Sequence, residues 1–359
     1  MIKKKIVNLL LNVAVILGMM PFVSSCSDSF IYEYEGDCRM KVKFEFTKHR
    51  QALQTFDGVG PDAFAKTVTS VHLFVLDAKS GELVFEQTEN TENLIDGCIM
   101  PVELDPGEYT FIAWCGLDSN DENNAFELQH NYGTRGGEDG KLSLKMASPT
   151  EPVHKEQYDA VYHGIVRNFT VSHDNMGEIV TVPVVKDTND LNIWIQHPYA
   201  SLDKGDYYVV YEDANGEIDF TDNFLISEDK QLSYKAYETT ILQSNTQYNG
   251  EMMESGAMIV HMSVSRLMAN HAENARLVIR NNLGTEVFAI PFIKFVLGLQ
   301  TFTKPGTEKD DQWYLDCEDT YNVSFFFTGY DQTWTAFRII VNNWVVVPDQ
   351  DWESGPGQD

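Results

Sequence analysis

Cysteine thiols are the side chains of this sequence whose spacing most directly suggests chemistry. Five are present, at positions 26, 38, 98, 115 and 317. The segments Ile99–Leu104 and Tyr109–Trp114 have the composition of strands and lie on either side of Pro106-Gly107. With a two-residue hairpin loop, Cys98 would face Cys115 at a distance that suits a disulfide. Pro-Gly favours a type II turn over the primed turns of hairpins, so free, buried thiols are the competing interpretation.

Patterns that would support catalysis or metal binding fail when their spacing is checked. The sequence contains no Gly-x-Ser-x-Gly, His-Glu-x-x-His or Cys-x-x-Cys motif. Gly133–Lys141 is not a phosphate-binding loop, because Arg135 stands where its first glycine belongs. Asp118–Asn124 lacks the glycine and the final acid of a calcium loop, so a solvated loop is favoured. We predict no catalytic residue, metal ligand or cofactor, with a dispersed glycosidase pair of acids as the open exception.

The charge balance of the chain excludes two classes of partner. Lys and Arg number 26, Asp and Glu number 54, and the formal net charge is −28. Nucleic acids and anionic membrane surfaces bind clustered positive charge. We therefore predict no nucleic-acid partner and no electrostatic binding to a bilayer.

The first 25 residues have the pattern of a secretory signal peptide. Lys3-Lys4-Lys5 is basic, and the apolar stretch Ile6–Met20 that follows is shorter than the roughly 20 residues a membrane-spanning helix needs. The segment ends in Val23, Ser24, Ser25 and Cys26. We therefore leave residues 1–25 out of the fold prediction.

The residues around Cys26 resemble the lipobox of bacterial lipoproteins, with an aliphatic residue and two small residues before a cysteine. That resemblance implies cleavage before Cys26 and acylation of its thiol by chains such as palmitate. Each buried CH₂ group contributes ~0.8 kcal/mol, so several chains would anchor the protein almost irreversibly. An ordinary signal peptide with a chance cysteine is the alternative.

The remainder of the chain has the pattern of an all-β protein. In Arg39–Thr47 the apolar residues alternate with polar ones, which is typical of a half-buried strand. Turn residues separate many such segments, and only Pro61–Lys66 and part of Met268–Ala275 suggest short helices. Further strands are predicted at Val71–Asp77, Leu83–Gln87, Ile99–Leu104, Tyr109–Trp114, Ala160–Val171, Ile179–Val185, Leu191–Gln196, Tyr207–Glu212, Met258–Val264, Ala275–Arg280, Glu286–Pro291, Tyr321–Thr328 and Ala336–Val347.

The polar run Lys186–Asp190 is the best candidate for a domain boundary, because it separates two series of strands. Each series has the size of one β-sandwich. We therefore predict a signal peptide over 1–25, an N-terminal sandwich over 26–188 and a C-terminal sandwich over 189–359.

The order of several short motifs after Cys26 resembles the FimB-like, fimbrillin-associated anchor lipoproteins of Bacteroidales fimbriae, the type V pili. Each motif alone is weak, and their order along nearly the whole mature chain carries the resemblance. The motifs are Gly36-Asp37-Cys38, Asp62-Ala63-Phe64, Val71–Asp77, Leu104–Tyr109, Ala113–Gly116, His163-Gly164, Tyr314-Leu315-Asp316, Tyr321-Asn322-Val323 and Ile339–Trp344.

The resemblance implies a fold and a role. The fold is two transthyretin-like β-sandwich domains in tandem after the lipoprotein signal peptide. The role is that of a surface-exposed outer-membrane lipoprotein at the base of a fimbrium, held by lipid on Cys26. Its partner would be a fimbrillin, paired through a donated β-strand. Val345-Val346-Val347 is a candidate donor strand, with an ordinary last core strand as the alternative.

Three other roles stay open. The same family contains tip and accessory adhesins, and the motifs do not separate these from anchors. A surface glycan-binding lipoprotein would use exposed aromatic residues on a sheet, although the tryptophans could equally be core residues. A hydrolase with dispersed carboxylates is the third. The candidate tryptophans are Trp194, Trp313, Trp334 and Trp344.

Overall fold

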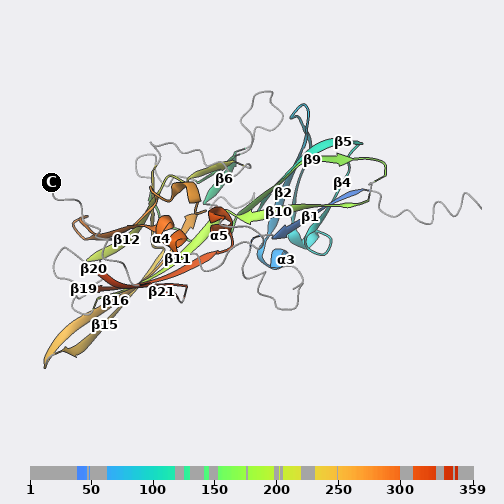
Figure 1. The fold of residues 1–359 in the computed structure, drawn as a ribbon. Helices are drawn as coiled ribbons and strands as arrows, with labels where there is room; N and C mark the ends of the chain where they lie inside the picture. Colours follow the sequence, from blue (N-terminus) through green and yellow to red (C-terminus); the bar gives the residue numbers. More distant parts are fainter. Residues whose placement is uncertain are drawn as a thin grey trace, which may run out of the picture.

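The chain folds into β-strands with a few short helices (Figure 1). The computed structural model describes residues 39–46, 48, 63–117, 125–129, 141–144, 153–174, 177–197, 202, 205–219, 231–248, 250–299, 310–328, 335–342 and 344–346. The all-β class predicted from the alternation of apolar residues is confirmed.

A seven-stranded sheet forms the first half of the molecule. Its strand order is β3-β2-β5-β9-β10-β1-β4. β1 pairs with β10 in parallel, and all the other strand pairs of this sheet are antiparallel. The strands are β1 (Met40–Phe46), β2 (Ser70–Asp77), β3 (Leu83–Asn90), β4 (Ile99–Val102), β5 (Gly107–Cys115), β9 (Tyr162–Val171) and β10 (Ile179–Lys186).

This first sheet curls around its own core. One cluster contains both Leu73 of β2, the strand next to one edge, and Met100 of β4, the strand at the other edge. In β1 the alternation places Val42 and Phe44 in that cluster, while Lys43 and Glu45 point outward. Register shifts between β2 and β3 and between β5 and β9 help the strands to bend.

Two further sheets pack face to face in the second half. A six-stranded sheet has the order β15-β16-β11-β19-β20-β21, and a five-stranded sheet has the order β18-β17-β12-β14-β8. One apolar cluster joins them, including Ile193 of β11 and Leu277 of β17. The strands are β8 (Val153–His154), β11 (Thr188–His197), β12 (Tyr207–Asp213), β14 (Leu232–Lys235), β15 (Glu238–Tyr248), β16 (Glu251–Ser265), β17 (Arg276–Asn281), β18 (Glu286–Pro291), β19 (Thr320–Thr328), β20 (Thr335–Val341) and β21 (Trp344–Val346).

The two halves are joined by more than the chain between them. Phe74 and Trp114 on the outward face of the first sheet belong to the second apolar cluster. A three-stranded sheet combines β6 (Phe126–Gln129) and β7 (Lys141–Leu144) with β13 (Glu217–Asp219), and β8 pairs with β14. Strands from before residue 188 thus complete sheets from after it, and the division into domains at 188/189 stays a prediction.

The helices are short and serve the core. The α-helices are α3 (Ala63–Thr67), α4 (Phe292–Gly298) and α5 (Asp311–Asp316), and the 3-10 helices are η2 (Thr91–Asn93) and η3 (Ala269–His271). Five residues of α4 are buried in the second cluster. None of the helices among the described residues has the length and apolarity that crossing a bilayer requires.

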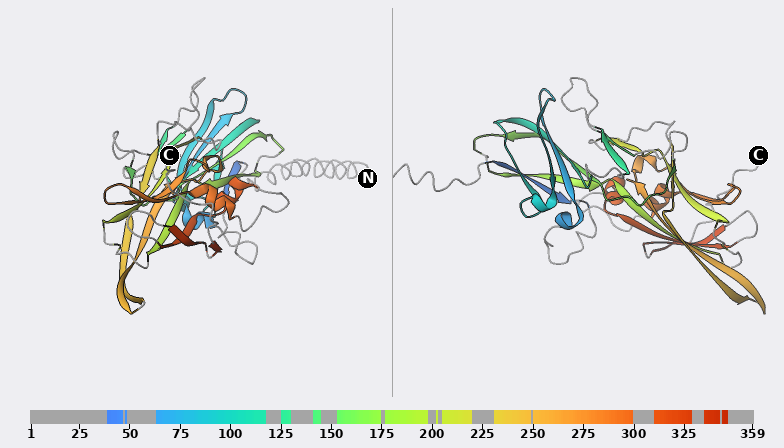
Figure 2. Two further views of the ribbon diagram at one scale, coloured as in Figure 1. Left: turned by 60° about the vertical axis from the view of Figure 1, so that its left-hand side comes forward. Right: turned by 180° about the vertical axis from the view of Figure 1, so that it is seen from behind.

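The molecule is elongated, with the first sheet at one end and the β15–β16 hairpin at the other (Figure 1 and Figure 2). β11 pairs with β16 only over residues 256–265, whereas β15 pairs with β16 as far as Tyr248↔Glu251. Residues 244–248 and 251–255 therefore continue past β11 as a two-stranded ribbon. This hairpin was not predicted, because β15 contains few apolar residues.

Candidate functional site

The predicted lipid-attachment residues Val23, Ser24, Ser25 and Cys26 lie outside the described residues. The loop Asp118–Asn124 lies outside them as well. In the part of the chain that is described, no three His, Cys, Asp or Glu side chains gather closely enough to hold a metal ion.

The predicted pairing of Cys98 with Cys115 is wrong. Cys98 directly precedes β4, and Cys115 is the last residue of β5. β4 pairs with β1, and β5 lies between β2 and β9, so β4 and β5 are not neighbours in the sheet. Cys115 pairs instead with Val71 and Tyr162, and the two cysteines form no disulfide with each other. Long-range sheet pairing has overridden the local hairpin that Pro106-Gly107 suggested.

The buried thiols are poor nucleophiles. Burial, with a smaller contribution from Asp187, raises the pKa of Cys115 far above its usual range. Burial and the neighbouring carboxylates of Asp316 and Glu318 raise the pKa of Cys317 to about 12. Because the thiolate is the reactive form, both groups stay protonated and inert at neutral pH.

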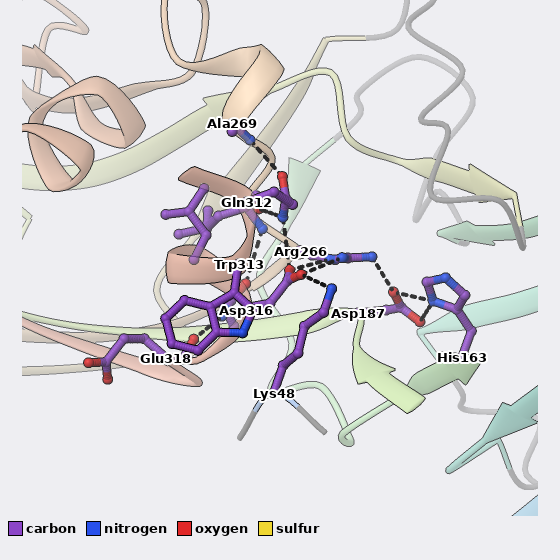
Figure 3. A network of polar contacts seen from close by, with 12 residues as sticks. Lys48, His163, Asp187, Arg266, Ala269, Gln312, Trp313, Asp316 and Glu318 are labelled. Carbon is purple, nitrogen blue, oxygen red and sulfur yellow. Dashed lines mark hydrogen bonds and ion pairs between the residues drawn. The ribbon is translucent and has the colours of Figure 1, made fainter. Parts of the chain in front are cut away.

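A network of buried polar contacts lies where the chain passes from the seven-stranded sheet to the six-stranded sheet (Figure 3). Asp187 is the single residue between β10 and β11, and it is buried. Its carboxylate oxygens both lie 2.8 Å from His163 Nδ1 on β9. Its backbone N–H donates to Val161 O, and its backbone carbonyl accepts from Arg266 N–H. This residue is therefore fixed through its main chain and its side chain.

Arg266, directly after β16, connects this point to helix α5. The side chain is only 2% exposed, and its Nε and Nη2 atoms donate to Asp316 Oδ1 and Oδ2, each over 2.9 Å. Its Nη1 lies 3.8 Å from Asp187 Oδ1. Lys48 Nζ also donates to Asp316 Oδ2, over 2.9 Å. We call His163, Asp187, Arg266, Asp316 and Lys48 the junction network.

Helix α5 holds Asp316 in place. The Asp310 side chain caps the helix by accepting from Trp313 N–H over 2.9 Å. Gln312 lies one turn before Asp316 on the same helical face, and its Nε2 donates to Asp316 Oδ1 over 2.8 Å. Its Oε1 accepts from Ala269 N–H, which ties α5 to η3. Trp313, one of the candidate exposed aromatics, is thus part of a helix beside this network.

In the junction network two carboxylates, those of Asp187 and Asp316, face one arginine and one lysine. A buried charge is tolerated only when it is paired and hydrogen-bonded, and a bidentate arginine–carboxylate pair provides both. Removing one partner of such a pair is costly because the other is left uncompensated. The arrangement is suited to fixing two sheets relative to each other, and it presents no open nucleophile.

The polar run Lys186–Asp190, which was predicted as a domain boundary, is largely buried. Asp187, Thr188 and Asn189 are all buried. Asn189 Nδ2 donates to Glu318 O, and Asn189 Oδ1 accepts from Leu267 N–H. The sequence offered one sign of this burial. The run between the two strands is polar, yet it contains none of the glycine, proline or serine residues that are typical of a flexible linker.

The outer face of the six-stranded sheet carries an exposed tryptophan. Trp194 on β11 is 40% exposed and lies between Ile259 of β16 and Ser324 of β19. On the same face, Asn192 Oδ1 lies 2.7 Å from His261 Nδ1, and Asn192 Nδ2 donates to Asn322 over 3.0 Å. Trp334 lies outside the described residues, and Trp344 belongs to β21.

The candidate donor residues Val345 and Val346 belong to β21, which pairs with β20 at one edge of the six-stranded sheet. Within the described residues this segment is the last strand of its own sheet. Val347 lies outside them.

Comparison with known proteins identifies a family. A family model described as "Fimbrillin-A associated anchor proteins Mfa1 and Mfa2" matches residues 34–349. No curated protein matches the chain in sequence.

Solved structures of similar fold come from Bacteroidales bacteria. A candidate adhesin from Bacteroides thetaiotaomicron is 22% identical with a TM-score of 0.68, over 86% of this chain and 97% of its own. A candidate polysaccharide-binding protein from the same organism is 25% identical with a TM-score of 0.64, over 88% and 99%. The fimbrial anchor protein Mfa2 from Porphyromonas gingivalis is 13% identical with a TM-score of 0.57, over 86% and 98%.

Proposed function

Because this chain belongs to the family of fimbrillin-A associated anchor proteins, we propose that it anchors a fimbrium to the outer membrane of its cell. The observation that carries the proposal is the match of the family model over residues 34–349, which includes both halves of the molecule. The role is structural rather than catalytic. Two features of the chain support this assignment.

The first is the N-terminal sequence. A basic and apolar leader ends at Val23-Ser24-Ser25-Cys26, and acyl chains on Cys26 would hold the protein in the bilayer. Covalent attachment suits a chain with a net charge of −28, which an anionic membrane surface would repel.

The second is the sheet architecture. An incomplete or open sheet edge can accept a strand from another chain, with backbone hydrogen bonds giving affinity and alternate side chains giving specificity. We propose that the anchor holds a fimbrillin in this way. Donor-strand pairing would make the attachment strong without a covalent bond.

The direct test is the variant Cys26→Ala. We expect it to leave the membrane fraction and to release fimbriae into the medium, because the lipid is the only proposed membrane contact. Mass spectrometry of the mature N-terminus should show acyl chains on Cys26 in the wild type. The neighbouring change Ser27→Ala is the control and should keep both protein and fimbriae on the cell. Retention of Cys26→Ala in the membrane fraction with fimbriae attached would contradict the proposal.

A second candidate function, as a glycan-binding or tip adhesin, is favoured by one observation. Trp194 exposes 40% of its surface on a sheet face that also carries the exposed Gln196. An aromatic face beside amide groups suits stacking and hydrogen bonding to a sugar ring. A relative with 25% identity is described as a candidate polysaccharide-binding protein.

Calorimetric titration of the purified protein against host and dietary glycans tests this candidate. Binding heat that disappears in Trp194→Ala would support it. Heat that survives the substitution would place any glycan site elsewhere, and the absence of heat with all glycans would leave the anchor role as the better account.

A further inference from the structure

The six-stranded sheet ends in a long strand that has a neighbour on one side only. β15 contains 11 residues and pairs with β16 along its whole length, from Glu238↔His261 to Tyr248↔Glu251. No described strand lies along its other side. In a strand at a sheet edge about half of the backbone N–H and C=O groups point away from the sheet, where another strand can bind them.

Three other edge strands among the described residues carry features that hinder strand addition. β3, an edge of the first sheet, carries Glu86 and Glu89 and has a register shift against β2. β4, the opposite edge, is four residues long and contains Pro101. β18 carries Glu286 and ends at Pro291. Short strands, charges, prolines and bulges are the means by which proteins protect sheet edges.

β15 has almost none of these features. Its sequence, ETTILQSNTQY, is uncharged after Glu238 and contains no proline, and its pairing with β16 has no register shift. Ile241 is half-buried, and Leu242 on the opposite face is 47% exposed. The alternation of side chains on the two faces is what an added strand would contact.

The position of β15 suits attachment of a partner. The β15–β16 hairpin lies at the end of the molecule opposite the first sheet, in both Figure 1 and Figure 2. The first sheet contains β1, which is the first described strand after Cys26. A chain held near its N-terminus would therefore present β15 on the side away from the membrane.

We propose that the open edge of β15 is where this protein binds an extended strand of the polymerising fimbrial subunit. The inference rests on the proposed anchoring function and names its docking strand. The incoming strand would be uncharged over about ten residues, to match Thr239–Tyr248, and would carry alternating side chains. A second copy of this chain is the less suitable occupant, because each copy carries a net charge of −28 and like charges repel.

The test compares two exposed aliphatic residues on edge strands, Leu242 of β15 and Val84 of β3, which are 47% and 48% exposed. Full-length lipidated protein is mixed with the polymerising subunit purified from the same fimbriae, and the bound fraction is measured. We expect Leu242→Lys to weaken binding about tenfold, because a lysine on an open edge opposes strand addition. Val84→Lys should bind as the wild type does.

Photocrosslinking locates the partner directly. A photoreactive residue in place of Ser244 on β15 should crosslink to the fimbrial subunit, whereas one in place of Glu86 on β3 should not. A crosslink at position 244 to a second copy of this chain would overturn the proposal, and so would equal binding by Leu242→Lys and the wild type. Thermal melting of each variant confirms that both substitutions leave the fold intact.

The two proposals fail differently in this experiment. If wild-type protein binds no fimbrial subunit, the anchoring function itself is contradicted. If the wild type binds and Leu242→Lys binds equally well, only the assignment to β15 is overturned.

Discussion

The junction network and the β15 edge are opposites in the way they treat polar groups. At the junction, Arg266 and Asp316 are buried, and each charge has a partner within hydrogen-bond distance. Along β15, only Glu238 is charged, and one side of the strand has no described neighbour. Buried pairs fix a structure but are closed to other molecules, whereas an open edge adds little stability and offers backbone groups to a partner.

With the proposed binding at β15, this contrast would separate stability from binding within one chain. Substitutions at the junction should destabilise the fold, and substitutions on β15 should change binding while the fold persists. The four experiments that follow measure that separation, from the largest expected effect to the smallest.

The largest effect is expected for Asp316→Ala. It leaves Arg266 buried without its bidentate partner, and Lys48 and Gln312 also lose an acceptor. We expect a loss of ~3–5 kcal/mol in the free energy of unfolding, measured by chemical denaturation.

The matched control for that variant is Glu273→Ala, which breaks an exposed ion pair with Lys294. It should change the free energy of unfolding by less than ~0.5 kcal/mol. Equal effects of the two changes would show that the junction has no special structural weight.

A second experiment asks whether charge itself is needed at the junction. The double variant Arg266→Met with Asp316→Leu replaces the buried pair by apolar residues of similar size. We expect it to be more stable than Asp316→Ala by ~2 kcal/mol or more, because no uncompensated charge is left inside. A double variant as unstable as the single one would mean that hydrogen bonds from this pair are required for folding.

Alkaline pH provides a third test, through the two thiols near the junction. The pKa of Cys115 and of Cys317 is raised in the folded protein, chiefly by burial. Unfolded thiols ionise near their ordinary pKa. The stabilisation that comes from keeping these thiols protonated is therefore fully present below the ordinary pKa, and it is lost progressively as the pH rises from there towards the raised pKa of the folded protein. We expect the free energy of unfolding to fall by roughly 1–3 kcal/mol from about pH 8 to about pH 10.

The control for the pH experiment is Cys317→Ala measured over the same range. Because one of the two raised thiols is gone, the decline with pH should be shallower than in the wild type. An unchanged decline would assign the pH dependence to other groups.

The smallest effect on stability is expected when the projecting ribbon is shortened. Replacing residues 244–253 by a two-residue turn removes the end of the hairpin that continues past β11, where the described side chains of Ser244, Asn245, Gln247, Glu251 and Met252 are exposed. The free energy of unfolding should stay within ~0.5 kcal/mol of the wild type. Binding of the fimbrial subunit should nevertheless be lost. A large destabilisation would mean that the ribbon supports the sheet.

The same contrast explains what could be predicted from the sequence. β1 and β11 alternate apolar and polar residues because one face of each is buried, and that pattern is local and visible. β15 was missed because most of its residues are polar and its two aliphatic residues, Ile241 and Leu242, are adjacent and so lie on opposite faces, which leaves no alternation to mark the strand. Its role in a sheet follows only from pairing with β16.

The junction network could not be predicted for a different reason. Arg266 and Asp316 are 50 residues apart in sequence, and His163 and Asp187 are 24 apart, so no spacing rule connects them. The disulfide prediction failed in a related way. It assumed that neighbouring strands in sequence would be neighbours in the sheet, whereas β4 and β5 each found distant partners.

The parallel pairing of β1 with β10 has a mechanical consequence. The register runs from Lys41↔Ile179 to Phe46↔Val184, and β10 continues through Asp187 into β11. A pull between the start of β1 and β11 therefore acts at opposite ends of this strand pair. Under that load the hydrogen bonds between β1 and β10 are sheared together instead of opening one after another. Resistance to forced unfolding is governed by the unfolding barrier, and shearing all of these hydrogen bonds at once opposes forced unfolding along the line from β1 to β11.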